Sequence, residues 1–166
     1  MSAILQSASV ARVRQALADA GVSSEVVELP GAARTAKDAA RFLGCEVGQI
    51  ANSLVFRAAS GEPLLVMSSG ARRVDLARLG DIIGEPVTKA DADFVRQATG
   101  FAIGGVPPLG HAAPLRTLVE ESLAAYSQLW AAAGHPHTVF PLSYAELLRI
   151  TAGLAVQAAA PVTPER

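Results

Sequence analysis

At the centre of the chain, Ile50-Ala51-Asn52-Ser53-Leu54-Val55-Phe56-Arg57-Ala58 and Pro63-Leu64-Leu65-Val66-Met67-Ser68-Ser69 are two mainly apolar runs. Ser60-Gly61-Glu62 lies between them, and a short polar break that contains glycine is typical of the connection in a β-hairpin. We therefore predict a hairpin here and place the other elements around it.

The chain before this hairpin predicts two helices and one strand. Residues 8–20 carry apolar side chains at helical spacing, and residues 25–29 form a strand-like run that Pro30-Gly31 closes. The Thr-x-x-Asp spacing that begins at Thr35 is typical of a helix start, so a second helix is expected after it.

The chain after the hairpin predicts a further mixture of helices and strands. Helices are expected to begin after Asp75 and Asp91, with a short strand at residues 86–89 between them. The remaining predicted elements are a strand at residues 117–120, a helix over residues 123–133, a strand at residues 138–142 and a helix that begins with the capping box Ser143-Tyr144-Ala145-Glu146.

Strands and helices thus alternate irregularly around one early hairpin. This order predicts an α+β (mixed α/β) fold, a single domain over residues 1–153 with a mixed, twisted β-sheet and helices around it. Residues 154–166 are rich in Ala, Pro and Val, and we expect them to form a loose tail.

The composition narrows the class of protein. The 166 residues are 51% hydrophobic and carry a formal net charge of −1, so no overall electric field draws the chain onto DNA. Its single cysteine, Cys45, excludes an internal disulfide framework and a cysteine-cluster metal site. No apolar run approaches the roughly 18 residues of a membrane span, and no secretory signal is evident, so we expect a soluble cytoplasmic protein with no membrane partner.

Two segments have the composition of a binding loop. Residues 104–110 hold three glycines and two prolines, which would let backbone N–H groups approach a ligand closely, although turns of every kind share this composition. Gly70-Ala71-Arg72-Arg73-Val74-Asp75 brings two arginines to a helix start, where either a phosphate contact or a solvated pair beside a capping Asp75 would fit. His111, His135 and His137 have no obvious further ligand, so no metal site is predicted.

Five motifs occur in order along the chain. They are Thr35-Ala36-Lys37-Asp38-Ala39-Ala40 with Leu43-Gly44, Gln49-Ile50-Ala51-Asn52-Ser53-Leu54-Val55-Phe56, the turn from Gly70 to Asp75, Thr99-Gly100, and Gly104-Gly105-Val106-Pro107-Pro108. With these motifs, roughly residues 8–153 resemble the YbaK/EbsC family, whose members are free-standing relatives of the editing domain in bacterial prolyl-tRNA synthetases.

The resemblance implies a trans-editing aminoacyl-tRNA deacylase. Such an enzyme hydrolyses the ester between a wrong amino acid and the terminal adenosine of a tRNA, in this family typically tRNA(Pro). The resemblance also implies substrate-assisted chemistry, in which a ribose hydroxyl helps to activate water and neither a metal nor a cofactor is needed. The expected partner is the acceptor end of a mischarged tRNA, with an aminoacyl-tRNA synthetase as a further candidate and no DNA.

The matching motifs also suggest which residues act. Gly104, Gly105 and Pro108 would shape the acyl pocket and Asn52 would orient the ester carbonyl or the sugar, so these four are the expected catalytic residues. The expected substrate-binding residues are Arg72 and Arg73 at the acceptor end, Ser53 and Thr99 as supporting hydrogen-bond partners, and also Gly100, Ile103, Val106 and Glu120.

Two positions depart from the family pattern. Asn52 stands where many relatives carry a lysine, and a neutral amide binds an ester or a phosphate more weakly than an ammonium group does, unless an arginine substitutes. Glu120 stands where relatives often have an aspartate after the strand. Asn52 therefore leaves an alternative function open, a non-catalytic module that binds a tRNA end, a nucleotide or a protein and has lost hydrolysis.

Overall fold

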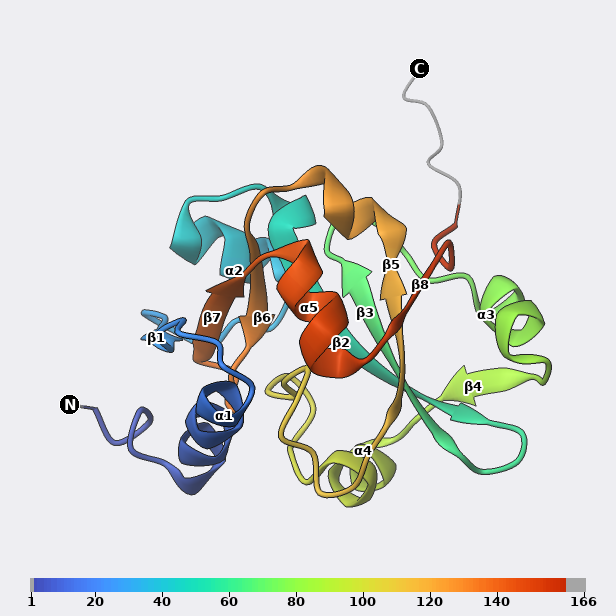
Figure 1. Cartoon of the computed structure of the whole chain (residues 1–166), viewed down its shortest axis with the longest axis horizontal. Coiled ribbons are helices and arrows are strands. Elements are labelled where there is room, and N and C mark those ends of the chain that lie inside the picture. The colour runs from blue at the N-terminus through green and yellow to red at the C-terminus, as the bar shows by residue number, and fades with distance from the viewer. Residues whose placement is uncertain (1, 161–166) are drawn as a thin grey trace.

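One mixed β-sheet runs through the molecule, and helices cover both of its faces (Figure 1). The computed structural model describes residues 2–160. In the described chain the strands follow the order β1-β7-β6-β2-β3-β5-β8, and β4 pairs with β2 outside this path. Their bounds are β1 Val27–Glu28, β2 Ile50–Ala58, β3 Pro63–Ser69, β4 Val87–Lys89, β5 Arg116–Glu120, β6 Leu129–Ala132, β7 Thr138–Leu142 and β8 Leu154–Val156.

The predicted hairpin is confirmed and lies at the centre of this sheet. β2 and β3 pair antiparallel from Ala51 opposite Ser69 to Arg57 opposite Pro63. β2 also pairs with β6 in parallel, as β3 does with β5 and β5 with β8, whereas the other strand pairs are antiparallel. The sheet is therefore mixed, and the predicted α+β class is confirmed.

The helices begin where the sequence predicts capping residues. α2 (Ala36–Leu43), α3 (Leu76–Ile83), α4 (Ala92–Thr99) and α5 (Tyr144–Thr151) follow Thr35, Asp75, Asp91 and Ser143, and each of these side chains accepts a hydrogen bond from a backbone N–H of the first turn. This contact satisfies a donor that the helix itself leaves without a partner. Ahead of them lies α1 (Ala8–Asp19), which Ser7 caps in the same way.

Alternation along the strands divides the core between the two faces of the sheet. Leu65 and Met67 of β3 point to the face that α1 and α5 cover, where they join the main hydrophobic cluster. Leu64 and Val66, their neighbours in sequence, point to the opposite face and pack in the cluster that includes Leu79 of α3. α2 packs on this second face as well, against Ile50 at the start of β2. The second face therefore carries two separate helices, α2 and α3.

Two predictions for the second half of the chain need correction. Residues 123–133 are not a helix, because the chain forms a short 3-10 turn at Glu121–Ala125 and then strand β6. The predicted loose tail is also ordered over part of its length, since β8 pairs with β5 and residues 157–160 are hydrogen-bonded to the turn before α3. Residues 161–166 of that predicted tail lie outside the described residues.

No helix in residues 2–160 is both long enough and apolar enough to cross a membrane.

Candidate functional site

The edge of β2 that faces away from β3 has a gap in its pairing. β6 pairs with this edge at Ile50 and Ala51, and β4 pairs with it from Phe56 to Ala58. Residues 52–55 lie between these partners, and no strand of residues 2–160 pairs with them on this edge. Gly70 of the hairpin donates its N–H to the Ile50 carbonyl at 2.9 Å, so alternation along β2 turns the backbone N–H and C=O of Ser53 toward the gap.

The side chains of this open stretch form the floor of a cleft. Side chains two residues apart share a face of a strand, so Asn52 and Leu54 lie on the same face as Ile50 and Phe56. Ile50 packs in the cluster under α2 and Phe56 packs in the cluster under α3. Asn52 and Leu54 therefore lie between the two helices, and Leu54 keeps 37% of its surface exposed.

The cleft consists of two adjoining hollows that share one wall. The first, here named the α2 recess, has a volume of about 260 Å³ and also reaches β6 and β7. The second, the α3 recess, has a volume of about 580 Å³ and reaches the turn before α3 and the end of β4. Both are lined by Ser53, Leu54, Ile103, Gly104 and Val106. Asn52 lines the α2 recess but not the α3 recess.

The loop that contributes residues 103–106 to the cleft depends on its two glycines. Gly104 has a φ of +90°, in the region that favours glycine. A Cβ atom on Gly105 would lie 2.8 Å from the backbone nitrogen of His135, closer than any side chain tolerates. These two glycines let the loop pack tightly on residues 134–136 while Ile103 stays 55% exposed over the cleft.

His111 fixes the other end of this loop. Its Nε2 lies 2.7 Å from the Pro107 carbonyl oxygen, and its ring meets Phe101 edge-on. Burial lowers the pKa of His111 by more than the hydrogen bond to Pro107 raises it. The neutral ring is therefore favoured, with Nε2–H donating to Pro107.

The charged side chains that line the cleft are all positive. Arg34 lines the α2 recess, and Arg73 and Lys89 line the α3 recess, whereas no aspartate or glutamate of residues 2–160 lines either hollow. Lys89 lies opposite Phe56 in the β2–β4 register, which puts it on the same face of the sheet as Asn52 and Leu54. A chain with a net charge of −1 thus presents a cationic cleft, which suits an anionic ligand.

The structure gathers about half of the expected site residues at the cleft. Asn52, Ser53, Arg73, Ile103, Gly104 and Val106 line one or both recesses. Gly105 and Pro108 are buried behind them in the same loop and do not line the cleft.

The other four expected residues lie elsewhere. The Thr99 hydroxyl is fully buried and bonds the backbone of Val95 and Phe101 at the end of α4, and Gly100 caps that helix with a φ of +84°. Arg72 and Glu120 face the C-terminal end of the described chain, where Arg72 bonds the Ala160 carbonyl and Glu120 the N–H groups of Ala158 and Ala159.

Several residues that line the cleft could not be recognised from the sequence. Arg34 stands just before the predicted cap of α2 and Lys89 at the end of a predicted strand, and neither position carried a motif of its own. Trp130 was assigned to a helix, yet as part of β6 it lines the α2 recess. Pairing of β6 and β4 with the same edge of β2 brings Trp130 and Lys89 to the site.

A metal centre has no support in the described part of the chain. No group of three or more His, Cys, Asp or Glu side chains in residues 2–160 is arranged to hold a metal ion. His135 and His137 contact each other, with ring centroids 5.1 Å apart. Burial, followed by the nearby charge of His137, lowers the pKa of His135.

Known proteins are similar to this chain in sequence and in fold. The model of the aminoacyl-tRNA editing domain family matches residues 30–150. A solved structure of a candidate trans-editing enzyme for prolyl-tRNA synthetase is 43% identical with a TM-score of 0.88, over 93% of this chain and 99% of that one.

Two further matches are more distant. The uncharacterized protein YwhH of Bacillus subtilis (strain 168) is 27% identical over 124 residues, which are 75% of this chain and 79% of that protein. The hypothetical protein APE2540 shares the fold at a TM-score of 0.84 and 23% identity, over 90% of this chain and 99% of that one.

Proposed function

Because this chain belongs to the aminoacyl-tRNA editing domain family, we propose that it is a trans-editing deacylase that hydrolyses the ester of mischarged tRNA(Pro). The observation that carries the proposal is the cationic cleft over the open stretch of β2. All of its lining residues fall between residues 33 and 139, within the part of the chain that matches the family. An aminoacyl-tRNA synthetase partner and a location in the cytoplasm belong to the same proposal.

The two recesses divide the substrate between them in this proposal. The α2 recess takes the aminoacyl group, because its walls include Ala36, Ala39, Ile50, Trp130 and Val139 and suit a small neutral side chain. The α3 recess takes the end of the tRNA, because Arg73 and Lys89 can bond phosphate oxygens there. The ester bond then lies at the shared wall.

At the shared wall, the residues of β2 can orient the ester. The Asn52 side chain offers an amide donor at the floor of the α2 recess, and the Ser53 backbone N–H faces the gap beside β2. Donors placed at a carbonyl stabilise the negative charge that develops on its oxygen when water attacks. The carbon–oxygen bond to the ribose then breaks, the ribose oxygen takes up a proton, and the free amino acid leaves. A neighbouring ribose hydroxyl helps to activate the water.

Single-turnover deacylation tests this function directly. The substrates are tRNA(Pro) charged with Ala, Cys, Ser, Thr, 2-aminobutyrate or Pro, with the wild type and Asn52→Lys compared side by side. We expect the wild type to clear a non-cognate ester and to spare Pro-tRNA(Pro). A wild type that is inactive on every ester, beside an active Asn52→Lys variant, would show that the chain has kept the pocket and lost hydrolysis.

The second candidate function is a non-catalytic module that binds a tRNA end, a nucleotide or a protein through the same cleft. The neutral Asn52 side chain at the floor of the α2 recess favours it, since that side chain brings no positive charge to the ester. Binding of charged and uncharged tRNA separates the two functions. An editing pocket prefers the aminoacylated form, whereas a module that binds only the tRNA end does not distinguish them.

A further inference from the structure

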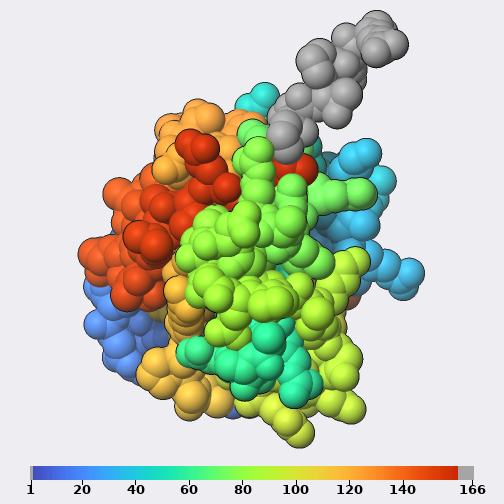
Figure 2. Space-filling model, turned by 90° about the vertical axis from the view of Figure 1, so that its right-hand side faces the viewer, coloured from blue at the N-terminus to red at the C-terminus, as the bar shows by residue number. Residues whose placement is uncertain are grey.

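The C-terminal end of the described chain is tied to the turn that carries Arg73. Residues 157–160, here named the C-terminal strap, run antiparallel to this turn and form a bridge between Ala159 and Val74. Asp75 donates its N–H to the Ala158 carbonyl at 2.8 Å, and Ala160 donates its N–H to the Arg73 carbonyl at 2.7 Å. In Figure 2 the C-terminal segment, in red, lies against the green chain that leads into α3. The backbone of Arg73 therefore depends on the strap.

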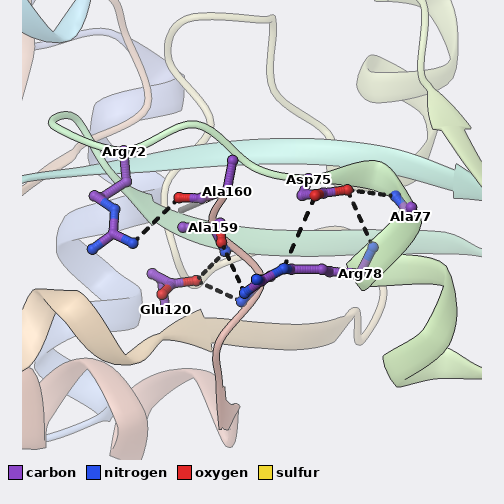
Figure 3. Close-up of polar contacts among 8 residues, drawn as sticks. Arg72, Asp75, Ala77, Arg78, Glu120, Ala159 and Ala160 are labelled. Atoms are coloured by element: carbon purple, nitrogen blue, oxygen red, sulfur yellow. Dashed lines mark hydrogen bonds and ion pairs between the residues drawn. The ribbon is translucent and has the colours of Figure 1, made fainter. Parts of the chain in front are cut away.

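The strap is in turn held by a buried carboxylate, that of Glu120 (Figure 3). Glu120 is only 3% exposed, and it is the only acidic or basic side chain among the buried residues of the described chain. Its Oε2 accepts hydrogen bonds from the N–H groups of Ala158 at 2.8 Å and Ala159 at 3.0 Å. A buried carboxylate is costly unless it is well bonded, and here both of its hydrogen bonds go to the strap.

Two arginines hold the carbonyl groups of the same segment. Arg72 donates to the Ala160 carbonyl and Arg78 of α3 to the Ala159 carbonyl, each at 3.3 Å (Figure 3). Glu120 therefore binds the N–H groups of the strap while Arg72 and Arg78 bind its carbonyl groups. Arg73 itself lines the α3 recess, and its backbone carbonyl is bonded by the strap.

We propose that Glu120 is a positioning residue for tRNA binding, which acts through the C-terminal strap to hold Arg73 against a phosphate of the acceptor end. The inference rests on the proposed function and adds to it a residue that does not touch the substrate. Glu120 lines neither recess, so it does not act as the direct substrate contact expected from the family motif. Its carboxylate instead accepts hydrogen bonds from the N–H groups of Ala158 and Ala159.

Binding of uncharged tRNA(Pro) over a series of KCl concentrations tests this role. The proteins compared are the wild type, Glu120→Gln, Arg73→Ala and the double variant. Glu120→Gln is expected to weaken binding by about three- to tenfold and to reduce the slope of log K against log[KCl] by roughly 0.7–0.9, the contribution of one phosphate contact. The double variant is expected to bind no more weakly than Arg73→Ala alone, because both changes remove the same contact.

Glu62→Gln is the matched control. It removes the same single negative charge from an exposed position at the β2–β3 turn, so it should bind tRNA as the wild type does. If the effects of Glu120→Gln and Arg73→Ala multiply, or if Glu120→Gln leaves the salt slope unchanged, Glu120 does not act through Arg73 and the inference is overturned.

Two further measurements keep the inference testable if Glu120→Gln folds poorly or if the wild type does not bind tRNA. Ala160→Pro removes the N–H that bonds the Arg73 carbonyl and leaves Glu120 in place, and it should give the same loss of salt slope. Hydrogen exchange at the Asp75 amide needs no RNA and should be faster in Glu120→Gln than in Glu62→Gln. Equal exchange in these two variants overturns the inference, whereas absence of tRNA binding by the wild type counts only against the proposed function.

Discussion

Gly104 contributes to the fold through its backbone conformation and to the cleft through its position in the wall. Its positive φ favours glycine, and the residue lines both recesses. An added Cβ would lie 3.5 Å from Pro136, an ordinary van der Waals contact. There is room for a methyl group at this position, so the cost of an alanine to the fold comes from its backbone conformation.

We expect Gly104→Ala to destabilise the protein by about 1 kcal/mol, the cost of a positive φ without glycine, and to slow deacylation on the order of 10- to 100-fold. Urea unfolding and single-turnover hydrolysis measure the two effects. Gly61→Ala is the matched control, because Gly61 has a φ of +92° at the β2–β3 turn and an added Cβ would meet only the Arg57 side chain, at 4.0 Å. It should lose similar stability and keep its activity. Full activity in Gly104→Ala would show that the loop does not shape the ester site.

His111 makes stability depend on pH. Its folded pKa lies below the unfolded value of about 6.5, so the unfolded chain takes up a proton first as the pH falls. The free energy of unfolding is therefore expected to decrease as the pH falls from about 6.5 toward the folded pKa, with no contribution above that window. Urea unfolding at pH 7.5 and pH 5.5 measures this decrease. It should be smaller in His111→Gln, and an equal decrease in both proteins would refute the role of His111.

At the residue scale, the family motifs predicted which side chains lie near the substrate. They did not predict which of those side chains form hydrogen bonds elsewhere in the fold. Asn52 and Gly104 lie at the cleft as expected, because each belongs to a segment whose local structure was predicted correctly. The Thr99 hydroxyl bonds the neighbouring backbone of Val95 and Phe101, whereas the Glu120 carboxylate bonds N–H groups that lie 38 and 39 residues away in sequence. No local pattern carries that information.

At the element scale, β6 shows how tertiary contacts override local preference. Residues 123–133 are rich in Ala and Leu, which favour helices, and this composition predicted one. In the structure, Leu129, Ala131 and Ala133 are buried and alternate with the half-buried Trp130 and Ala132. This alternation has the period of a strand with neighbours on both sides, β2 and β7. Four residues between two partners therefore form a strand despite their helix propensity.

The capping box of α5 offers a prediction at the same scale. The Ser143 hydroxyl accepts from the Glu146 N–H at 3.1 Å, and the Glu146 carboxylate accepts from the Ser143 N–H at 3.0 Å. Ser143→Ala should lower the free energy of unfolding by about 1 kcal/mol, while Ser143→Asp should keep most of it. Because α5 contributes no residue to either recess, deacylation by the folded variants should stay at the wild-type rate. Chemical unfolding with a parallel activity assay checks both parts, and a large activity loss in Ser143→Ala would contradict the assignment of the cleft.

For the whole molecule, the distribution of charge matters more than its sum. The formal net charge is −1, yet Arg34, Arg73 and Lys89 line the cleft. The two phosphate contacts that Arg73 and Lys89 can make in the α3 recess would give a slope of about −1.4 for log K of tRNA binding against log[salt]. Lys89→Ala should reduce that slope by about 0.7, whereas Lys37→Ala, at the only other lysine and outside the cleft, should not. Equal slopes for the two variants would show that the α3 recess does not hold the tRNA.

The arrangement of the whole sheet could be predicted only in outline. The hairpin, the caps and the mixed class follow from local patterns, because each depends on residues a few positions apart. The cleft instead depends on β6 and β4 pairing with opposite ends of one edge of β2, with partners as much as 80 residues away in sequence. The strap that holds Arg73 comes from a segment whose composition predicts no structure at all.

The division of the cleft into two recesses also bears on how this protein can change over time. Beyond their shared wall, the α2 recess is built by α2, β6 and β7, and the α3 recess by the turn before α3, β4 and α4. A substitution that enlarges or narrows one hollow therefore leaves most of the other intact. Mutation can therefore change the ligand preference of one recess while selection preserves that of the other recess. A family with this arrangement can diversify by small steps.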